Sequence, residues 1–350
     1  MQSSTLARSI LAAMIAVALV PVGQRAAEAC GAFFSVRVVT PEQRPSLSRE
    51  KVLLIHDAEV GREHFIREVA FERALEPFGF VVPTPTRPEV ESIETNPFTK
   101  LRDRFPFARP RGIPDGYGSG SGRGSGSGAG PSVEVLEVKQ VGSFTAFVLT
   151  ANDAEALASW LADNDLVTTP ETDPWLAHYV GAGFFYVAMR YDPPSSGKRS
   201  GVVAAETIRI SFATPVAYYP YYEPDTQLPK RKRLMELWYI GREAVVPIAL
   251  RDSEGERRWL SPFEEGLTSL DARKQIQAAL RDELEVFLPA DDGGALVVQT
   301  FQDQKVTRTG WGDVLFAFKE PHTLSPRALA DLRPLMSILD PELAKEQATP

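Results

Sequence analysis

The chain has 350 residues and a mass of 38.5 kDa, enough for one large domain or two ordinary ones with a buried core. With 43% hydrophobic and 24% charged residues and a mean hydropathy of -0.15, the composition excludes wholesale disorder, a collagen-like chain and a membrane protein with many spans. Its 38 Lys and Arg against 46 Asp and Glu give a net charge of -8 that is spread along the chain, so nucleic acid is not an expected partner.

Residues 1–29 are predicted to be a signal peptide. A short basic segment precedes an uncharged apolar run over residues 10–22, and an Ala-Glu-Ala sequence of the kind that precedes cleavage ends the segment. The apolar run is shorter than the roughly 20 residues that a membrane-spanning helix needs. The sequence therefore predicts an exported protein, periplasmic or extracellular, whose mature chain has no transmembrane span.

The only cysteine, Cys30, would become the first residue after cleavage. Lipoprotein processing also leaves a cysteine at this position, so a lipid anchor on Cys30 is one possibility. Against it, Ala27 stands where a lipoprotein signal usually has leucine. A single cysteine excludes an intramolecular disulfide and a metal-thiolate cluster, so stability must come from core burial.

A Gly/Ser-rich stretch over residues 115–131 divides the mature chain into a first and a second part. Alternating glycine and serine offer no side chains to pack and have a high backbone entropy to lose, which predicts a mobile loop. A phosphate-binding loop is not indicated, because no apolar strand leads into the stretch and no Gly-Lys-Ser/Thr sequence ends it.

The first part begins with a predicted hairpin. Residues 51–57 and 64–71 are β-rich runs joined by a turn in which Gly61 can take a positive φ. A third strand is predicted over residues 78–82 and is expected to end at the three prolines of residues 83–88. That proline stretch is interpreted as a rigid connector, with a ligand-binding edge as the alternative.

The second part alternates strands and helices. Its predicted strands are residues 133–138, 144–149, 184–191, 207–212, 234–240, 244–250, 295–301 and 313–318. Its predicted helices are residues 153–164, 173–181 and 271–287, and a last one begins at residue 325. Pro174 is expected at the first position of the second helix and Gly181 after its last. Period-two alternation predicts one buried face for the strand over residues 207–212.

Together these elements predict an α+β fold with a mixed, mainly antiparallel sheet and a few packed amphipathic helices. Ordered landmarks, namely residues 30–34, 78–85, the glycine-rich loop, 141–142 and 179–189, make the chain similar to the bacterial family catalogued as domain of unknown function 2330. The resemblance covers residues 30–220. It implies export and a fold but no active site, since the family has no established activity. Residues 221–350 are expected to be an α+β extension of this domain or a small second domain.

The chain departs from the family at one position that bears on redox chemistry. Members commonly have a second cysteine five positions after the first, where this chain has Ser35. The local disulfide that the resemblance would imply cannot form here, which argues against a redox role.

Two histidines are candidate metal ligands. His56 and His64 would lie almost opposite each other in the predicted hairpin, with Asp57 and Glu63 beside them. A slip of one residue in register would instead place the two imidazoles on opposite faces. The alternative interpretation is a pair of exposed strand histidines without a metal.

A tyrosine-rich and basic segment is the candidate binding surface. Its members are Tyr218, Tyr219, Tyr221, Tyr222, Lys230, Arg231, Lys232 and Arg233. Exposed tyrosines would suit carbohydrate or peptide, and four neighbouring cations would suit an anionic envelope polymer or lipid head groups. The alternative is a packed tyrosine strand next to a solvated basic loop.

We therefore expect a non-catalytic binding or scaffolding module of the bacterial cell envelope, with an envelope polymer or protein as partner and no cofactor. The alternative is an exported hydrolase, metal-dependent through His56 and His64. A general base at His178 finds no matching nucleophile, because the Gly-x-Ser-x-Gly sequence and a reactive cysteine are both absent.

Overall fold

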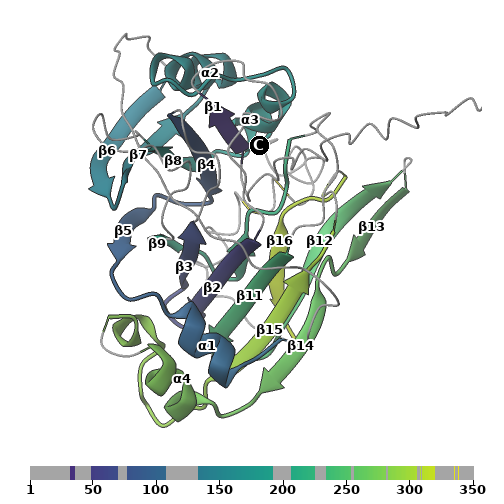
Figure 1. Cartoon of the computed structure of the whole chain (residues 1–350). Helices are drawn as coiled ribbons and strands as arrows, with labels where there is room; N and C mark the ends of the chain where they lie inside the picture. Colours follow the sequence, from purple (N-terminus) through teal and green to yellow (C-terminus); the bar gives the residue numbers. More distant parts are fainter. Residues whose placement is uncertain are drawn as a thin grey trace, which may run out of the picture.

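The computed structural model describes residues 32–35, 49–69, 77–107, 133–191, 206–224, 234–253, 256–280, 283–305, 308, 310–319, 335 and 338. Within them, three β-sheets form most of the structure and helices are few (Figure 1). The sheets are antiparallel except for one parallel pair of strands. The α+β prediction is confirmed in outline, but sheet dominates over helix. No helix in these ranges is both long and apolar enough to span a bilayer.

The first sheet has five antiparallel strands in the order β1-β4-β8-β7-β6. These are β1 (Ala32–Ser35), β4 (Phe78–Thr84), β8 (Phe185–Tyr191), β7 (Phe144–Ala151) and β6 (Val133–Val141). A two-residue turn joins β6 to β7, and Gly142 takes a positive φ of 58° there. Pro83 is the last residue but one of β4 and lies beyond the part paired with β1, so the strand runs past the first proline.

Two helices pack on this sheet, α2 (Ala154–Asp163) and α3 (Thr172–Gly181) (Figure 1). Helix α2 begins as predicted, because the Asp153 carboxylate accepts the backbone N–H of Ala156 at 2.8 Å. Helix α3 begins earlier than predicted, so Pro174 is its third residue and not its first. The left-handed glycine after α3 is Gly183, with φ of 71°, and not Gly181.

The second sheet has seven strands in the order β14-β15-β11-β2-β3-β9-β5. These are β14 (Glu264–Ser269), β15 (Val297–Asp303), β11 (Leu234–Gly241), β2 (Arg49–Asp57), β3 (Arg62–Val69), β9 (Glu206–Ala213) and β5 (Glu89–Ile93). Strands β2 and β3 form the predicted hairpin, and Gly61 has φ of 61° in its turn. Strand β11 runs parallel to β2, so the residues on either side of Pro220 share one sheet.

One face of the seven-stranded sheet carries α1 (Phe98–Arg104), α4 (Arg273–Leu280) and the 3-10 helix η1 (Glu285–Phe287). Trp238 fixes α1 by donating its indole N–H to the Phe105 carbonyl at 3.0 Å. The single helix predicted over residues 271–287 is not continuous, because Glu283 and Leu284 form a turn before η1. In this turn the Glu283 carboxylate accepts the backbone N–H groups of Glu94 and Thr95, each at 3.0 Å, a tertiary contact that the local helical pattern does not carry.

The third sheet has four strands in the order β10-β16-β12-β13. These are β10 (Ala217–Tyr219), β16 (Val314–Phe318), β12 (Val245–Ser253) and β13 (Glu256–Leu260). It packs on the other face of the seven-stranded sheet, where the rings of Tyr239 and Phe316 are stacked with centroids 5.9 Å apart. Strands β12 and β13 form a hairpin at the edge of the molecule (Figure 1).

Strand β9 is buried on both faces, which corrects the prediction of one buried face. Its polar residues Thr207, Arg209 and Ser211 are at most 7% exposed. The reason is that Phe287 of η1, from a distant part of the chain, packs over Arg209 and over His64 on the face that the sequence pattern assigns to solvent. The predicted signal peptide, the Gly/Ser-rich stretch and most of the last predicted helix lie outside the described residues.

Candidate functional site

The tyrosine-rich segment lies in the core. Tyr218, Tyr219 and Tyr221 are each 0% exposed, and Tyr222 is half-buried. The prediction that these tyrosines form an aromatic contact surface is therefore wrong for the three buried ones. Each of the three rings packs against a phenylalanine. Tyr219 contacts Phe65 of β3, while Tyr218 and Tyr221 contact Phe184 and Phe263, which lie in connections between elements. Tertiary packing, and not ligand contact, explains the composition of this segment.

Asp313 is the polar centre of this packed region. Its carboxylate accepts the hydroxyl of Tyr179 at 2.9 Å, the hydroxyl of Tyr218 at 2.9 Å and the backbone N–H of Tyr222 at 2.9 Å. Burial raises the pKa of Asp313 to about 6, although the accepted hydrogen bonds act in the opposite direction. Burial, with a further contribution from Asp313, raises the pKa of both tyrosines well above the ordinary value.

Glu63 is a second buried carboxylate linked to the first through Tyr218. It accepts the backbone N–H of Tyr218 at 2.6 Å, while the same residue's hydroxyl reaches Asp313. Burial raises the pKa of Glu63 well above its ordinary value, and the hydrogen bond from Tyr218 lowers it in part. Two carboxylic acids such as Glu63 and Asp313 can share a proton in an active site, but here both are at most 2% exposed. Neither can meet a substrate from solvent in this conformation.

The two candidate metal ligands lie on opposite faces of the seven-stranded sheet. His56 pairs with Glu63, and His64 pairs with Ile55, so the register is one residue away from the one that would bring the imidazoles together. The Nε2 atom of His56 donates to the Thr214 carbonyl at 3.1 Å. Within the described ranges, no three His, Cys, Asp or Glu side chains are grouped to hold a metal. The candidate pair of ligands is therefore not brought together, and the alternative of exposed strand histidines is also wrong, because His56 is 1% and His64 9% exposed.

His64 instead forms a pair with a serine. Its Nδ1 atom lies 2.7 Å from the Ser211 hydroxyl, which also accepts a hydrogen bond from Arg209. Burial, together with the charges of Arg209 and Arg62, lowers the pKa of His64 to about 3. A neutral imidazole that accepts from a serine hydroxyl is the arrangement of a base and its nucleophile.

The surroundings of this pair are those of a core and not of a catalytic centre. Ser211 is 0% exposed, and the Phe287 ring covers His64 with centroids 4.6 Å apart. Strand β9 pairs with β3 and β5 on its two sides, so the backbone N–H groups beside Ser211 serve the ladders. An acyl-transfer site needs unengaged donors for the developing oxyanion, and this strand offers none there. The serine and histidine are therefore interpreted as a satisfied buried pair.

A third polar cluster is formed by buried ions. Arg308 lies 3.1 Å from the Asp303 carboxylate and 3.2 Å from that of Glu223, and its guanidinium lies over the Tyr221 ring at 4.3 Å. Burial acts to raise the pKa of Asp303, but Arg308 and Lys305 outweigh it and hold that pKa below the ordinary value. Glu50 and Arg67 extend the cluster. Its three acids and three bases balance, which is typical of a structural ion network.

Helix α3 carries His178, which sequence reasoning considered as a general base. Its ring packs edge-on against Tyr222 at 5.2 Å, and burial lowers its pKa. No serine hydroxyl or other nucleophile is recorded within hydrogen-bond reach of His178 in the described ranges. The cation run Lys230 to Arg233 and the candidate lipid site Cys30 lie outside the described residues, so both stay predictions.

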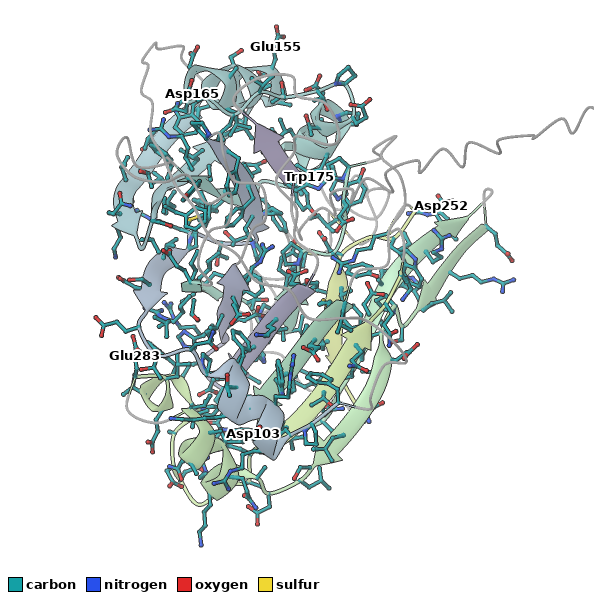
Figure 2. The ribbon with its side chains drawn as sticks, viewed as in Figure 1. Asp103, Glu155, Asp165, Trp175, Asp252 and Glu283 are labelled. Carbon is teal, nitrogen blue, oxygen red and sulfur yellow. The ribbon has the colours of Figure 1, made fainter. Side chains whose placement is uncertain are left out.

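The exposed candidate is strand β13, which sequence reasoning did not single out. All five of its residues are exposed, with Trp259 at 47% and Leu260 at 44%. Val246, on the neighbouring strand β12, is 38% exposed. Asp252, near the tip of this hairpin, is labelled in Figure 2. A signal was present in the sequence, because Glu256 to Leu260 combine two arginines with a tryptophan and lack the alternation of a core strand.

The comparisons with known proteins agree with the resemblance seen in the sequence. A family model described as an uncharacterized protein conserved in bacteria (DUF2330) matches residues 24–222. No curated protein matches the chain. A solved structure described as the crystal structure of baculovirus P35 is similar with a TM-score of 0.37 and 6% identity, over 79% of this chain and 98% of that chain, which is too distant to carry an argument. Since the family model matches more than half of the 350 residues, the chain belongs to the bacterial family DUF2330.

Proposed function

We propose that this protein is an exported, non-catalytic binding module of the bacterial cell envelope, and that it contacts its partner through the β12–β13 hairpin. The observation that carries the proposal is the exposure of Trp259 and Leu260 on a strand whose five residues all face solvent. Tryptophan is enriched where proteins meet their partners, because it supplies a large apolar area at a small cost in side-chain entropy. Neither side chain contributes to the buried core clusters.

The internal polar groups support a binding role over catalysis. The hydroxyl of Ser211 and the carboxylates of Asp313 and Glu63 resemble catalytic groups in type, but each is at most 2% exposed. Each also has a hydrogen-bond partner inside the protein. A hydrolase needs at least one such group at the surface of a cleft, so the hydrolase alternative has less support.

Export and the cell envelope remain part of the proposal. The support is the Ala-Glu-Ala sequence at the end of residues 1–29 and the apolar run before it. Intact-mass spectrometry on protein from the exported fraction tests this directly. A chain that begins at Cys30 supports export, and an added diacylglycerol mass would place the protein on a membrane surface. A cell-associated chain that still carries residues 1–29 would contradict export.

The binding role is tested by site-specific photo-crosslinking in the native cells. A benzoylphenylalanine replaces Trp259 in one strain and Val286 in another, because Val286 is also an exposed apolar residue, at 74%, but lies on η1. We expect a discrete higher-mass adduct at position 259 and none at position 286. Equal adducts at both positions, or none at either, would contradict a binding surface on the hairpin.

A further inference from the structure

The backbone hydrogen bonds of β12 show which groups of β13 point to solvent. The Asp252 N–H donates to the Gly310 carbonyl, and the Gly312 N–H donates to the Leu250 carbonyl, both at 2.8 Å. The backbone N–H and C=O groups of Leu250 and Asp252 therefore point away from β13. Those of Arg251, which lies between them, point toward β13. In an antiparallel pair, the partner of Arg251 exchanges both hydrogen bonds with it, and that partner is Arg258.

The neighbours of Arg258 therefore face the other way. The backbone N–H and C=O groups of Arg257 and Trp259 lie on the outer side of β13, because backbone direction alternates along a strand. Strand β13 is the last in its sheet, so no described strand receives these groups. Two outward donors and two outward acceptors, spaced as in any β-ladder, match the backbone of an extended peptide.

The side chains beside these groups give the edge a chemical preference. Arg257 and Trp259 are two residues apart and share one face of the strand. Arg258 has Glu256 as its ion-pair partner, whereas Arg257 has none among the described residues. The cross-strand neighbour of Trp259 is the half-buried Leu250, and that of Arg257 is the exposed Asp252, with which Arg257 forms no ion pair among the described residues. An added strand would thus meet an apolar surface at one position and an unpaired guanidinium at the next position on that face.

Strand β13 lacks a shift in register and burial, two features that protect other sheet edges, although it is short and carries three charged residues. Edge strands β6 and β14 each contain a shift in register of the kind that disrupts further pairing. Strand β10 has only three residues, all buried, and β5 is flanked by the ion pairs Arg62–Glu89 and Lys139–Glu91. Strand β13 pairs with β12 without a shift and contains no proline. An edge without a bulge or proline keeps the regular spacing of donors and acceptors that an added strand needs.

We propose that the outer edge of β13 binds an extended segment of a partner protein by strand addition, with an acidic side chain of that segment opposite Arg257 and an apolar one against Trp259. This inference rests on the proposed binding function and names the class of its partner. A second copy of the chain fits less well. Antiparallel self-pairing centred on Arg257 or on Arg258 would set like charges directly opposite each other.

The test uses the mature chain and a fluorescein-labelled octapeptide of the repeat Glu-Thr-Val-Thr as the probe, with fluorescence anisotropy as the readout. In an extended strand this repeat places glutamate and valine two residues apart on the same face, as Arg257 and Trp259 are. Two variants at one position separate the contributions. Arg257→Ala removes the charge and keeps the outward N–H, whereas Arg257→Pro removes both. We expect roughly threefold weaker binding for the alanine variant, as for an exposed ion pair. The proline variant should bind at least about tenfold more weakly than the alanine variant, because one peptide acceptor loses its donor.

Further controls guard against trivial effects. Circular dichroism and the midpoint of thermal unfolding check that both variants fold, which is expected because Arg257 is exposed and its N–H does not serve the β12 ladder. A matched octapeptide with lysine in place of glutamate should bind more weakly than the glutamate probe. A glutamate probe with N-methyl groups along one edge should not bind.

Specific outcomes would overturn the inference. Equal affinity of the Arg257→Ala and Arg257→Pro variants would show that the outward N–H is not used, and equal affinity of the lysine probe would remove the acidic partner. If a crosslink forms at position 259 while these peptide results fail, the binding function stands and strand addition falls. If sedimentation shows a dimer of the mature chain that Arg257→Pro dissociates, the occupant of the edge is a second copy and the proposed partner is wrong.

Discussion

Asp313 and Asp303 form a natural pair of contrasting buried acids. Each is at most 3% exposed, and each accepts a tyrosine hydroxyl, from Tyr218 at 2.9 Å and from Tyr221 at 2.8 Å. They differ in their charged neighbours, because Asp303 lies 3.1 Å from Arg308 and no ion pair is recorded for Asp313 within the described ranges. We expect Asp313→Asn and Asp303→Asn to change the free energy of unfolding with opposite dependences on pH.

The magnitude for Asp313 follows from its pKa. Burial raises this pKa from 3.8 to about 6, and each pH unit of difference corresponds to about 1.36 kcal/mol. A carboxyl whose pKa is higher in the folded state stabilises the fold fully below its unfolded pKa and loses that contribution as the pH rises through 6. Between pH 3 and pH 8 the wild type should therefore lose about 3 kcal/mol of stability relative to Asp313→Asn, whose side chain stays neutral.

The sign reverses for Asp303. Its pKa is held below the ordinary value, so its contribution is present above the unfolded pKa and is lost only as the pH falls through the lower folded value. Replacing it with asparagine leaves Arg308 buried with one carboxylate fewer. Breaking a buried ion pair in this way costs about 3–5 kcal/mol near pH 7. That penalty should shrink as the solution becomes strongly acidic.

The assay is urea unfolding of the mature chain, followed by tryptophan fluorescence at several pH values from 3 to 8. The wild type and each variant are compared at the same pH, so that contributions from other acids such as Glu63 cancel. A difference between wild type and Asp313→Asn that stays constant over the whole range would refute the reasoning about burial. A destabilisation by Asp303→Asn that grows toward acid would refute the assignment of Arg308 as its counterion.

Three further predictions concern single positions. Gly142→Ala should destabilise the chain by more than Gly293→Ala. Both glycines have a positive φ, but only at position 142 would an added Cβ meet a neighbour, the Glu206 carboxylate; the midpoints of thermal unfolding of the two variants test this. Asp153→Ala should cost about 1 kcal/mol through the lost cap of α2, measured by urea unfolding, and Asp153→Asn should restore most of it. Arg308→Met should lower the free energy of unfolding by about 3–5 kcal/mol at pH 7, since it leaves the buried carboxylates of Asp303 and Glu223 without their cation. Calorimetry of the variant and the wild type measures this difference.

The elements that sequence reasoning placed correctly are those with local signals. The β2–β3 hairpin needs only two β-rich runs and a residue that tolerates positive φ, which Gly61 supplies. Helix α2 needs only the Asp153 cap and an apolar face that includes Leu157 and Leu161, both buried. Because these causes lie within a few residues of their effects, the sequence alone determines them.

Long-range contacts explain the failures. The polar face of β9 follows the alternation of a half-exposed strand, yet Ser211 is buried because Phe287, 76 positions later in the chain, packs over His64 beside it. The tyrosine segment reads as surface-like because tyrosine is common at interfaces. Its burial depends on Asp313, which supplies the acceptor that the hydroxyls of Tyr179 and Tyr218 need. No local pattern carries that information.

The same contrast bears on where function lies in this fold. His64, Ser211 and Asp313 attract attention by residue type, but the fold accounts for each of them, since each satisfies a buried neighbour. The fold does not account for Trp259, which is about half exposed on a strand that contributes nothing to the core clusters. A large apolar side chain costs free energy when it faces water and is retained where another surface covers it. Residues that the folded state leaves unexplained are therefore better candidates for function here than residues of catalytic type, which is why the β13 edge and not the buried polar clusters is the surface to test.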